Sequence, residues 1–353
     1  MRSLPSVPET IDDMDDSRDM PAGQPLRAIL EHCQEIIYRE FSKADREALV
    51  KQRSYRGRAV RTAYLGSTAV ILAIAQLAFP PKSTPILLWF PEYFLKYFLP
   101  ACEMLTAGFA VLIILLGIGT YLKEQWLLAR YRAERLRLLK FKFLLEPAMW
   151  SADDAAIELC RGDLCDQVQE ISNSRFPALE SWIAEGTVPC VLKAPAPGLS
   201  AQALEELVAY YRRKRLNFQA DYLAGATTRA FKKDSRTRLV PPVLFFGSVA
   251  FVLAHFGVEV SAGLEVWARL LILMAAALPA LGAGFRIYRS ANEFARNASR
   301  FEANHNALRI LSERLRHAKD SMSAFREMGF CEQVLEADHR EWQRLMVEAE
   351  WFG

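Results

Sequence analysis

A few polar residues inside long apolar stretches are the places where this sequence could act on ions or solutes. They are Gln76, Glu103, Thr106 and Thr120. Polar groups are costly in lipid, so those that persist usually face a partner or a water-filled path. A ring of Glu103 carboxylates would favour cations at the outer mouth of a pore, with the other three facing its lumen. The alternative is that Glu103, like His255 and Arg269, lies near the end of a span where its charge reaches water.

The sequence contains no recognisable catalytic or metal-binding motif. Its five histidines do not fall in the HExxH spacing, and neither a GxSxG nor a GxxxxGK[ST] pattern occurs. The six cysteines form no CxxC pair, so reduced thiols are a better interpretation of them than zinc ligands. We therefore predict a protein that is not an enzyme and that needs neither a metal nor a cofactor.

Two further sets of residues predict contacts rather than chemistry. Small residues recur every four positions at Ala276, Ala280 and Gly284, a spacing that lets membrane helices approach closely. We expect this face to pack within the chain, with packing between subunits as the alternative. Basic residues beside the apolar runs are expected to contact anionic lipid headgroups, each contributing about 1 kcal/mol near the surface. They are Arg58, Arg61, Lys123, Arg236, Arg238 and Arg286.

Four apolar runs predict the elements that must hold these side chains. The runs cover 62–79, 100–122, 240–258 and 264–287, and each is close to the length that crosses a bilayer. The second run continues without a helix breaker into basic sequence, which predicts one long helix over 100–145, half in lipid and half in water. The predicted fold class is all-α. We expect a polytopic membrane protein with four transmembrane helices in two hairpins that extend into long cytosolic helices.

The distribution of positive charge orients the predicted hairpins. The flanks 46–61, 123–142, 229–238 and 286–300 hold between four and seven lysines and arginines each, whereas the two opposite loops hold two at most. Positive charge stays in the cytosol, so both termini and the centre of the chain are expected there. Both hairpins then insert the same way, as a parallel repeat, which a weak alignment between the two halves supports.

The rest of the sequence divides into segments outside the membrane. Residues 1–23 are acidic and contain several prolines, which predicts a disordered tail. Residues 86–99 are rich in aromatic side chains, so an interfacial helix is expected there, with a re-entrant pore segment as the alternative. The other predicted units are a first two-transmembrane unit over 24–145, a cytosolic insert and linker over 146–200, a second two-transmembrane unit over 201–320 and a C-terminal helix over 321–353.

Composition indicates the class of partner. The chain has 353 residues, is 52% hydrophobic and carries a net charge of +3. Its apolar residues lie in two blocks between highly charged stretches, which is typical of a multi-pass membrane protein. A net charge of +3 is too small to attract nucleic acid through a general positive field. Membrane topology already explains the basic clusters. The expected partners are the lipid bilayer and further copies of the chain, and not nucleic acid.

Three short sequence segments lie near the apolar hairpins. They read Tyr55-Arg-Gly-Arg-Ala-Val-Arg-Thr-Ala-Tyr64, Gln125-Trp-Leu-Leu-Ala-Arg-Tyr-Arg-Ala-Glu-Arg-Leu-Arg137 and Leu216-Asn-Phe-Gln-Ala-Asp-Tyr222. In these segments the chain resembles the SLATT family of bacterial two-transmembrane effectors. The resemblance covers most of 25–145 and 201–318, as a tandem pair. The resemblance implies a pore-forming effector of the bacterial inner membrane in antiphage or inter-microbial conflict. Many family members pair with nucleotide-signal synthases or sensors. The short insert of this chain offers no visible sensing domain, so a cytosolic sensor or a signalling-nucleotide partner is implied.

Two functions are therefore expected from different classes. The first is an oligomeric membrane pore or channel-like effector that is gated through its cytosolic helices. Four spans per chain are few for a wide pore, so a homo-oligomer is expected. The alternative is a membrane-anchored helical scaffold that recruits a cytosolic partner. A small-solute transporter is disfavoured by the parallel repeat, because many transporters use inverted repeats.

Overall fold

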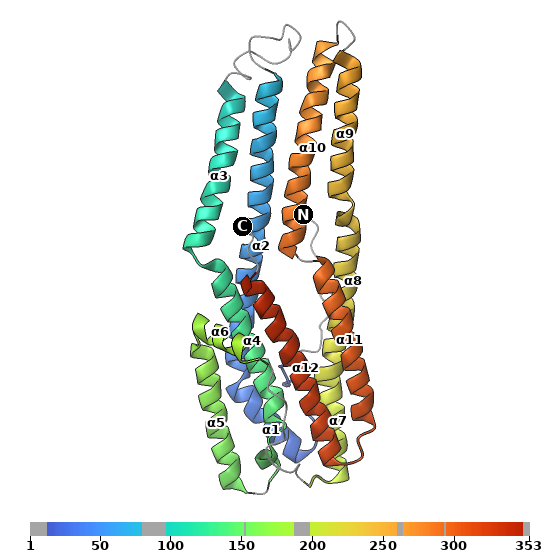
Figure 1. Cartoon of the computed structure of the whole chain (residues 1–353). Coiled ribbons are helices and arrows are strands. Elements are labelled where there is room, and N and C mark those ends of the chain that lie inside the picture. Colours follow the sequence, from blue (N-terminus) through green and yellow to red (C-terminus); the bar gives the residue numbers. More distant parts are fainter. Residues whose placement is uncertain are drawn as a thin grey trace. The chain divides into compact units, whose positions relative to one another are not determined.

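The computed structural model describes residues 13–79, 97–151, 153–186, 198–259, 264–292 and 294–348. Within these ranges the chain folds into helices joined by turns and short loops, and no strand occurs among them (Figure 1). The all-α class is therefore confirmed for the described part of the chain. Residues 86–96 of the segment expected to be interfacial or re-entrant over 86–99, and most of the linker before residue 198, lie outside the described residues.

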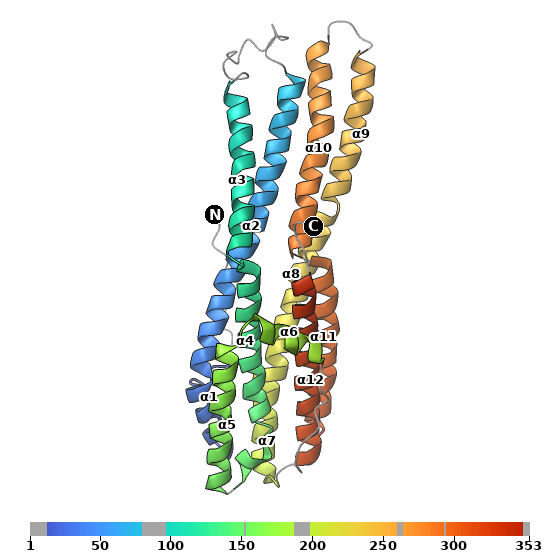
Figure 2. The same cartoon turned by 60° about the vertical axis from the view of Figure 1, so that its left-hand side comes forward.

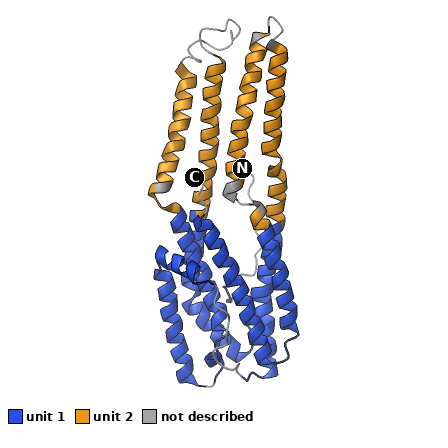
Figure 3. Ribbon diagram, viewed as in Figure 1, with its two compact units in different colours: residues 1–51, 123–227, 299–350 blue, residues 52–122, 228–298, 351–353 orange. Residues whose placement is uncertain are grey.

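The chain divides into two compact units, and each takes segments from both halves of the sequence (Figure 3). Unit 1 contains Met1–Lys51, Lys123–Thr227 and Ser299–Glu350, and unit 2 contains Gln52–Leu122, Thr228–Ala298 and Trp351–Gly353. The two units predicted from the sequence, over 24–145 and 201–320, each contribute residues to both compact units. The observed grouping follows from physical type, because apolar spans associate with one another whereas amphipathic helices bury their stripes in a common core.

Four helices of the described chain are long and apolar enough to cross a membrane. They are α2 (Tyr38–Ala78), α3 (Leu99–Gly119), α9 (Val240–Glu259) and α10 (Glu265–Asn292). Few residues of their most apolar windows are buried, and Leu77 leaves 83% of its surface accessible. Continuous apolar surface of this extent marks contact with lipid or another protein. In both views α9 and α10 lie side by side (Figures 1 and 2).

The predicted continuous helix over 100–145 is wrong, because the helix breaks near the end of the apolar run. Helix α3 ends at Gly119, α4 (Leu122–Phe143) begins two residues beyond Thr120, and Tyr121 between them has φ 46°. A non-glycine residue in this left-handed region costs free energy, so other contacts must stabilise the break. Arg58 Nη1 supplies one by donating to Leu116 O and to Thr120 Oγ1, each at 3.1 Å.

Capping side chains and one glycine mark where several helices of unit 1 begin and end. The Asp153 side chain accepts the Ala155 N–H before α5, and the Ser200 side chain accepts the Ala203 N–H before α7, as expected for helix N-caps. Gly186, with φ 71°, ends α6. Besides α2 and α4, the helices that lie wholly or partly in unit 1 are α1 (Gln24–Ile36), η2 (Pro147–Trp150), α5 (Asp154–Asn173), α6 (Phe176–Glu185), α7 (Ala201–Tyr211), η3 (Arg212–Asn217), α8 (Phe218–Arg238), α11 (Phe294–Arg316) and α12 (Ser321–Glu348).

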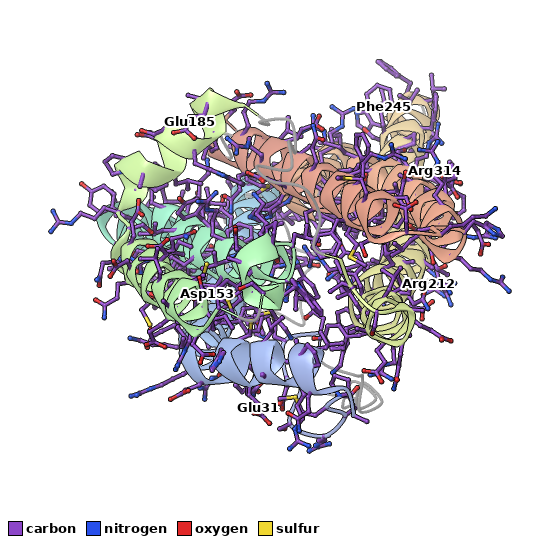
Figure 4. All side chains as sticks on the ribbon, turned by 90° about the horizontal axis from the view of Figure 1, so that it is seen from below. Glu31, Asp153, Glu185, Arg212, Phe245 and Arg314 are labelled. Atoms are coloured by element: carbon purple, nitrogen blue, oxygen red, sulfur yellow. The ribbon has the colours of Figure 1, made fainter. Side chains whose placement is uncertain are left out.

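One hydrophobic core joins these helices in unit 1. It includes Leu30 of α1, Phe141 of α4, Tyr211 of α7 and Phe325 of α12, all of them buried. Helix α5, which lies within the insert predicted over 146–200, adds Leu164 to this core. Side chains fill the space between the ribbons of unit 1, and Glu31 lies on the outward side of α1 (Figure 4).

The expected disorder of residues 1–23 is wrong for the part that the structure describes. Residues 13–19 have turns and bends but no helix, and Asp13, Met14 and Asp16 are fully buried. Composition alone favoured a solvated tail, because an acidic segment cannot bury its charges without partners. Buried cations of unit 1 supply those partners.

Candidate functional site

The most unusual feature of unit 1 is a buried group of cations that holds an acidic stretch of the same chain. We call residues 13–19 the acidic segment. We call Arg137, Lys140, Lys214 and Arg215 the cation cluster. Lys140, Lys214 and Arg215 expose 2% of their surface or less, and charged residues are almost never buried to this extent without partners.

Asp13 occupies the first of two positions in this site. Its Oδ2 atom lies 3.1 Å from Arg137 Nε and 3.8 Å from Arg215 Nη1, and it accepts a hydrogen bond of 3.1 Å from Gln219 Nε2. Two guanidinium groups and one amide therefore converge on a single carboxylate. Arginine suits such contacts because its planar group presents several donors to an oxyanion.

Asp16 occupies the second position. Its Oδ2 lies 2.7 Å from Lys140 Nζ, and its Oδ1 lies 3.5 Å from Lys214 Nζ and accepts the Tyr210 hydroxyl at 2.9 Å. Lys140 also donates to Asp13 O at 2.8 Å and to Met14 O at 3.2 Å. Two cations and one neutral donor again contact one carboxylate. The two positions therefore offer the same numbers of charged and neutral donors.

A buried ion pair with α12 completes the site. Arg215 donates from Nε to Glu332 Oε1 at 2.9 Å and from Nη2 to Glu332 Oε2 at 2.6 Å, a bidentate pair. The Tyr211 hydroxyl donates to the same Oε1 at 2.6 Å. The guanidinium of Arg215 also lies 4.4 Å from the centre of the Phe141 ring. Arg215 is thus fixed from several directions and points one face towards Asp13.

A π-helical turn positions half of the cation cluster. Residues Arg212–Asn217 form η3, a π-helix between α7 and α8. A π-turn adds one residue to the helical repeat, and such turns are frequent at functional sites. Here Lys214 and Arg215 are adjacent in sequence and both are buried, which a regular α-helix with one inward stripe does not readily provide.

Titratable neighbours of the site stay neutral at physiological pH. Burial raises the pKa of Cys33 to about 12 and that of Cys331 to about 12, so neither thiol is a ready nucleophile. Burial, together with the nearby carboxylate of Asp16, also raises the pKa of Tyr210 well above its ordinary value. The arrangement therefore holds anions, and its neutral neighbours act as hydrogen-bond donors.

Sequence reasoning missed this site because it assigned the basic residues to membrane topology. A signal was present in the spacing of α4. Ala133, Leu136, Lys140 and Leu144 follow one another at intervals of three or four residues, so the lysine stands on the buried stripe. A cation on an apolar stripe needs a buried anion. The sequence does not say which of its many carboxylates fills that role.

The structure brings two of the predicted intramembrane residues together. Gln76 of α2 donates from Nε2 to Glu103 Oε2 of α3. Thr106 donates its hydroxyl back to Cys102 O at 2.9 Å, and Thr120 donates to Leu116 O at 2.7 Å. Hydroxyls that return to their own helix satisfy their bonding locally. Within one chain these four residues therefore do not form a common polar cluster.

The predicted small-residue face approaches a second helix at two of its three positions. Ser67 of α2 donates to Ala280 O at 3.3 Å. A Cβ atom built on Gly284 would lie 2.5 Å from Ser67 Oγ and 3.7 Å from Ala63 O. This contact joins α2 to α10 within the chain. Ala276 is half-buried on the same helix.

Replacing Gly284 with leucine is expected to destabilise unit 2 by about 1–3 kcal/mol, because overpacking forces the two helices apart. The Gly284→Ala variant should have a smaller effect, since the Ser67 hydroxyl can rotate away. Thermal unfolding in detergent measures both. Gly108→Leu is the matched control, because nothing lies within 4 Å of a Cβ at that position. Equal losses in the Gly284 and Gly108 leucine variants would contradict the close approach.

The predicted lipid-contacting residues fall into two groups. Arg61, Arg236, Arg238 and Arg286 are exposed. Arg58 instead donates to the end of α3, and Lys123 donates from Nζ to Val347 O of α12 at 2.9 Å. Charge beside an apolar run is therefore used for hydrogen bonds within the chain at Arg58 and Lys123, and it remains exposed at the other four positions.

No protein-family model, curated protein or solved structure matches this chain. The described residues also contain no group of three or more potential metal ligands. Function must therefore be inferred from the chain itself.

A buried histidine lies on α12 of unit 1. His339 stacks on Trp342 with ring centres 5.7 Å apart and lies 5.7 Å from the Trp182 ring. Burial lowers the pKa of His339 to about 3. The nearby cations Arg130, Arg300 and Arg137 also lower this pKa, whereas the negative charge of Glu134 raises it. The imidazole is therefore neutral at physiological pH.

Unit 1 should lose stability as pH falls from 7 to 5. The folded pKa of His339 lies below the unfolded value of 6.5, so its contribution is complete above pH 6.5 and declines below it. At pH 5 the expected loss is about 2 kcal/mol in the free energy of unfolding. Denaturant titrations at each pH, followed by tryptophan fluorescence, measure this. The His339→Gln variant should flatten the slope, whereas His317→Gln, at an exposed position, should not. An unchanged slope in His339→Gln would refute this assignment.

Proposed function

We propose that this chain is a homo-oligomeric membrane pore or channel-like effector, gated by its helices outside the membrane. The observation that carries the proposal is the sharing of helices between the two units. Helix α2 contributes residues 38–51 to unit 1 and 52–78 to unit 2, and α8 is divided between residues 227 and 228. A helix is stiff over this length, so a change in the packing of unit 1 acts directly on the apolar segments.

The polar groups of the spans support assembly from several copies. Gln76 and Glu103 bond to each other, and Thr106 bonds to its own helix, so one chain presents few groups to line a path. Large apolar side chains cover the outside of the four helices. A water-filled path then requires neighbouring copies, with part of the exposed apolar surface against them and the rest against lipid.

Charge supports the orientation within the proposal. The basic flanks of the four apolar helices agree with the positive-inside rule when both hairpins run in parallel and both termini lie in the cytosol. In the bacterial inner membrane, unit 1 would then face the cytosol. The resemblance to the SLATT family adds a role in antiphage or conflict defence, with a cytosolic sensor or a signalling nucleotide as the activating partner.

Leakage measurements test the pore. Purified full-length protein in vesicles of anionic and neutral lipid is expected to release an entrapped dye or ions, and production in bacterial cells should depolarise the membrane. Intact vesicles together with an undisturbed membrane potential, at protein levels confirmed by immunoblot, would reject a pore.

Glu103→Gln is expected to reduce the preference for cations over anions, because it removes a carboxylate from the proposed path. The reversal potential under a salt gradient measures this preference directly. Glu124→Gln is the matched control, since Glu124 is exposed on α4 beyond the break in the helix. If both variants keep the wild-type reversal potential, Glu103 does not face the conducting path.

A membrane-anchored scaffold is the alternative, and a groove on unit 1 favours it. The groove has a volume of about 920 Å³ and lies along α11 and α12. Its lining includes Arg309, Ile310, Arg314 and Arg326, and Ile310 leaves 57% of its surface exposed. A scaffold would bind a cytosolic protein there without any leakage from vesicles, so the vesicle experiment separates the two functions.

A further inference from the structure

We propose that the cation cluster is a binding site for a compact oxyanion with at least two phosphoryl groups, which the acidic segment fills as an internal ligand in this structure. This inference concerns unit 1 and holds whether or not the protein forms a pore. It rests on the donors that surround Asp13 and Asp16, on the irregular structure of the acidic segment, and on the charge that remains when the segment leaves.

The donors form two equivalent positions. Arg137, Arg215 and Gln219 surround the Asp13 carboxylate, and Lys140, Lys214 and Tyr210 surround the Asp16 carboxylate. Each position offers two cations and one neutral donor. This is the donor set that binds a phosphoryl group in proteins, because its oxygens accept several charge-assisted hydrogen bonds at once. Two adjacent positions suit two linked phosphoryl groups.

The acidic segment presents oxygen atoms much as a bound oxyanion would. Lys214 Nζ donates to Asp15 O at 2.8 Å and lies 2.7 Å from Asp19 Oδ1. Lys140 likewise contacts two carbonyl oxygens as well as the Asp16 carboxylate. The segment is neither helix nor strand, and Ser17 and Arg18 in its middle are exposed. Its departure would therefore unfold no helix, but it would withdraw the buried Met14 side chain from the core of unit 1.

Departure of the segment would leave the site positively charged. Arg215 keeps its bidentate contact with Glu332, and Arg137 keeps Glu134 at 2.7 Å. Lys140 and Lys214 would lose the carboxylates of Asp16 and Asp19. A buried cation that loses a carboxylate, as Lys140 would, is strongly unfavourable, so the empty site must take up an anion or water, or rearrange. An external anion and the acidic segment would then compete for the same site.

The first experiment removes the internal ligand while keeping its shape. The full chain in detergent is compared with its Asp13→Asn, Asp16→Asn variant, using inorganic triphosphate as the probe. The variant should be less stable, and triphosphate should raise its Tm and bind it at least about tenfold more tightly than wild type, because no carboxylates compete. Sodium chloride and sulfate at equal ionic strength give the baseline. Glu31→Gln, Glu158→Gln is the control for general loss of negative charge, since both residues are exposed.

Three outcomes would overturn the proposal. They are the absence of triphosphate binding to the Asp13→Asn, Asp16→Asn variant, equal binding to that variant and to Glu31→Gln, Glu158→Gln, and undiminished binding after Lys140→Met is added. If the double variant does not fold, Asp19→Asn replaces it, because the Asp19 side chain is already 32% exposed. That milder change should still tighten triphosphate binding relative to wild type, and no change would reject the site.

Wild-type protein offers an independent measurement. Triphosphate that displaces the acidic segment should speed tryptic cleavage after Arg18, whereas slowed or unchanged cleavage would contradict displacement. A second arm adds diphosphatidylglycerol to the micelles, because that lipid carries two phosphate groups on one headgroup. Faster cleavage with triphosphate alone identifies a soluble anion, and faster cleavage with the lipid alone identifies a headgroup.

Discussion

Replacing Glu332 with glutamine should lower the free energy of unfolding of unit 1 by about 3–5 kcal/mol, since it leaves a buried cation without its partner. Glu332 exposes 1% of its surface and receives two hydrogen bonds from Arg215 and one from Tyr211. Glutamine keeps the shape but removes the charge and one of the acceptor oxygens. Denaturant titration in detergent, followed by tryptophan fluorescence, gives the change.

A double-mutant cycle and a surface control make this test specific. Combining Arg215→Met with Glu332→Leu replaces the pair by apolar groups, and the coupling energy between the two sites should reach about 2–3 kcal/mol. Glu313→Gln removes a similar carboxylate from the pair with Arg316, where both side chains are 62% exposed. The control should change stability by no more than about 0.5 kcal/mol. Equal effects of Glu332→Gln and Glu313→Gln would mean that the buried pair does not hold unit 1 together.

Phe141→Ala should destabilise unit 1 by about 3–5 kcal/mol, because it opens a cavity in a close-packed core. Phe141 is fully buried on α4, with its ring edge-on to Tyr211 at 5.8 Å between centres. The same ring lies beneath the guanidinium of Arg215, so the substitution also removes a cation–π contact. The Phe141→Leu variant should recover most of the loss, since it fills much of the volume.

Phe330→Ala is the matched control for Phe141→Ala. Phe330 lies on α12 and leaves 46% of its surface exposed, so truncation there creates no closed cavity. A change of no more than about 0.5 kcal/mol is expected for a surface position of this kind. If Phe330→Ala costs as much as Phe141→Ala, the centre of unit 1 does not lie at the contact between α4 and α7.

Several features of the fold could be predicted from local sequence, because local forces determine them. Apolar runs of sufficient length predicted helices α2, α3, α9 and α10, since an unbroken apolar stretch leaves the backbone no better way to satisfy its hydrogen bonds in lipid. Ser200 is of a residue type that favours helix N-caps, and its side chain accepts the Ala203 N–H. The small-residue spacing predicted a close helix approach, and the structure adds α2 as the helix that approaches.

Other features depend on residues that are distant in sequence. The break at Tyr121 follows Gly117 and Gly119, but glycine is also common within continuous membrane helices, so these residues do not by themselves predict the break. It is stabilised by Arg58, whose side chain reaches Leu116 O from another helix. Gln76 and Glu103 were each predicted to be polar residues in the spans, but their mutual hydrogen bond follows from the pairing of α2 with α3. Long-range contacts of this kind leave no periodicity in the sequence.

Local sequence was enough to predict a helical protein with four helices that are apolar enough to span a membrane, and to indicate where several helices begin. These properties depend on composition and on spacing within a few residues. The burial of the acidic residues 13–19 became visible in the folded structure, whereas composition predicted that they belong to a solvated tail. Their burial depends on Lys140 and Lys214, two cations more than a hundred residues further along the chain, so no local pattern could reveal it.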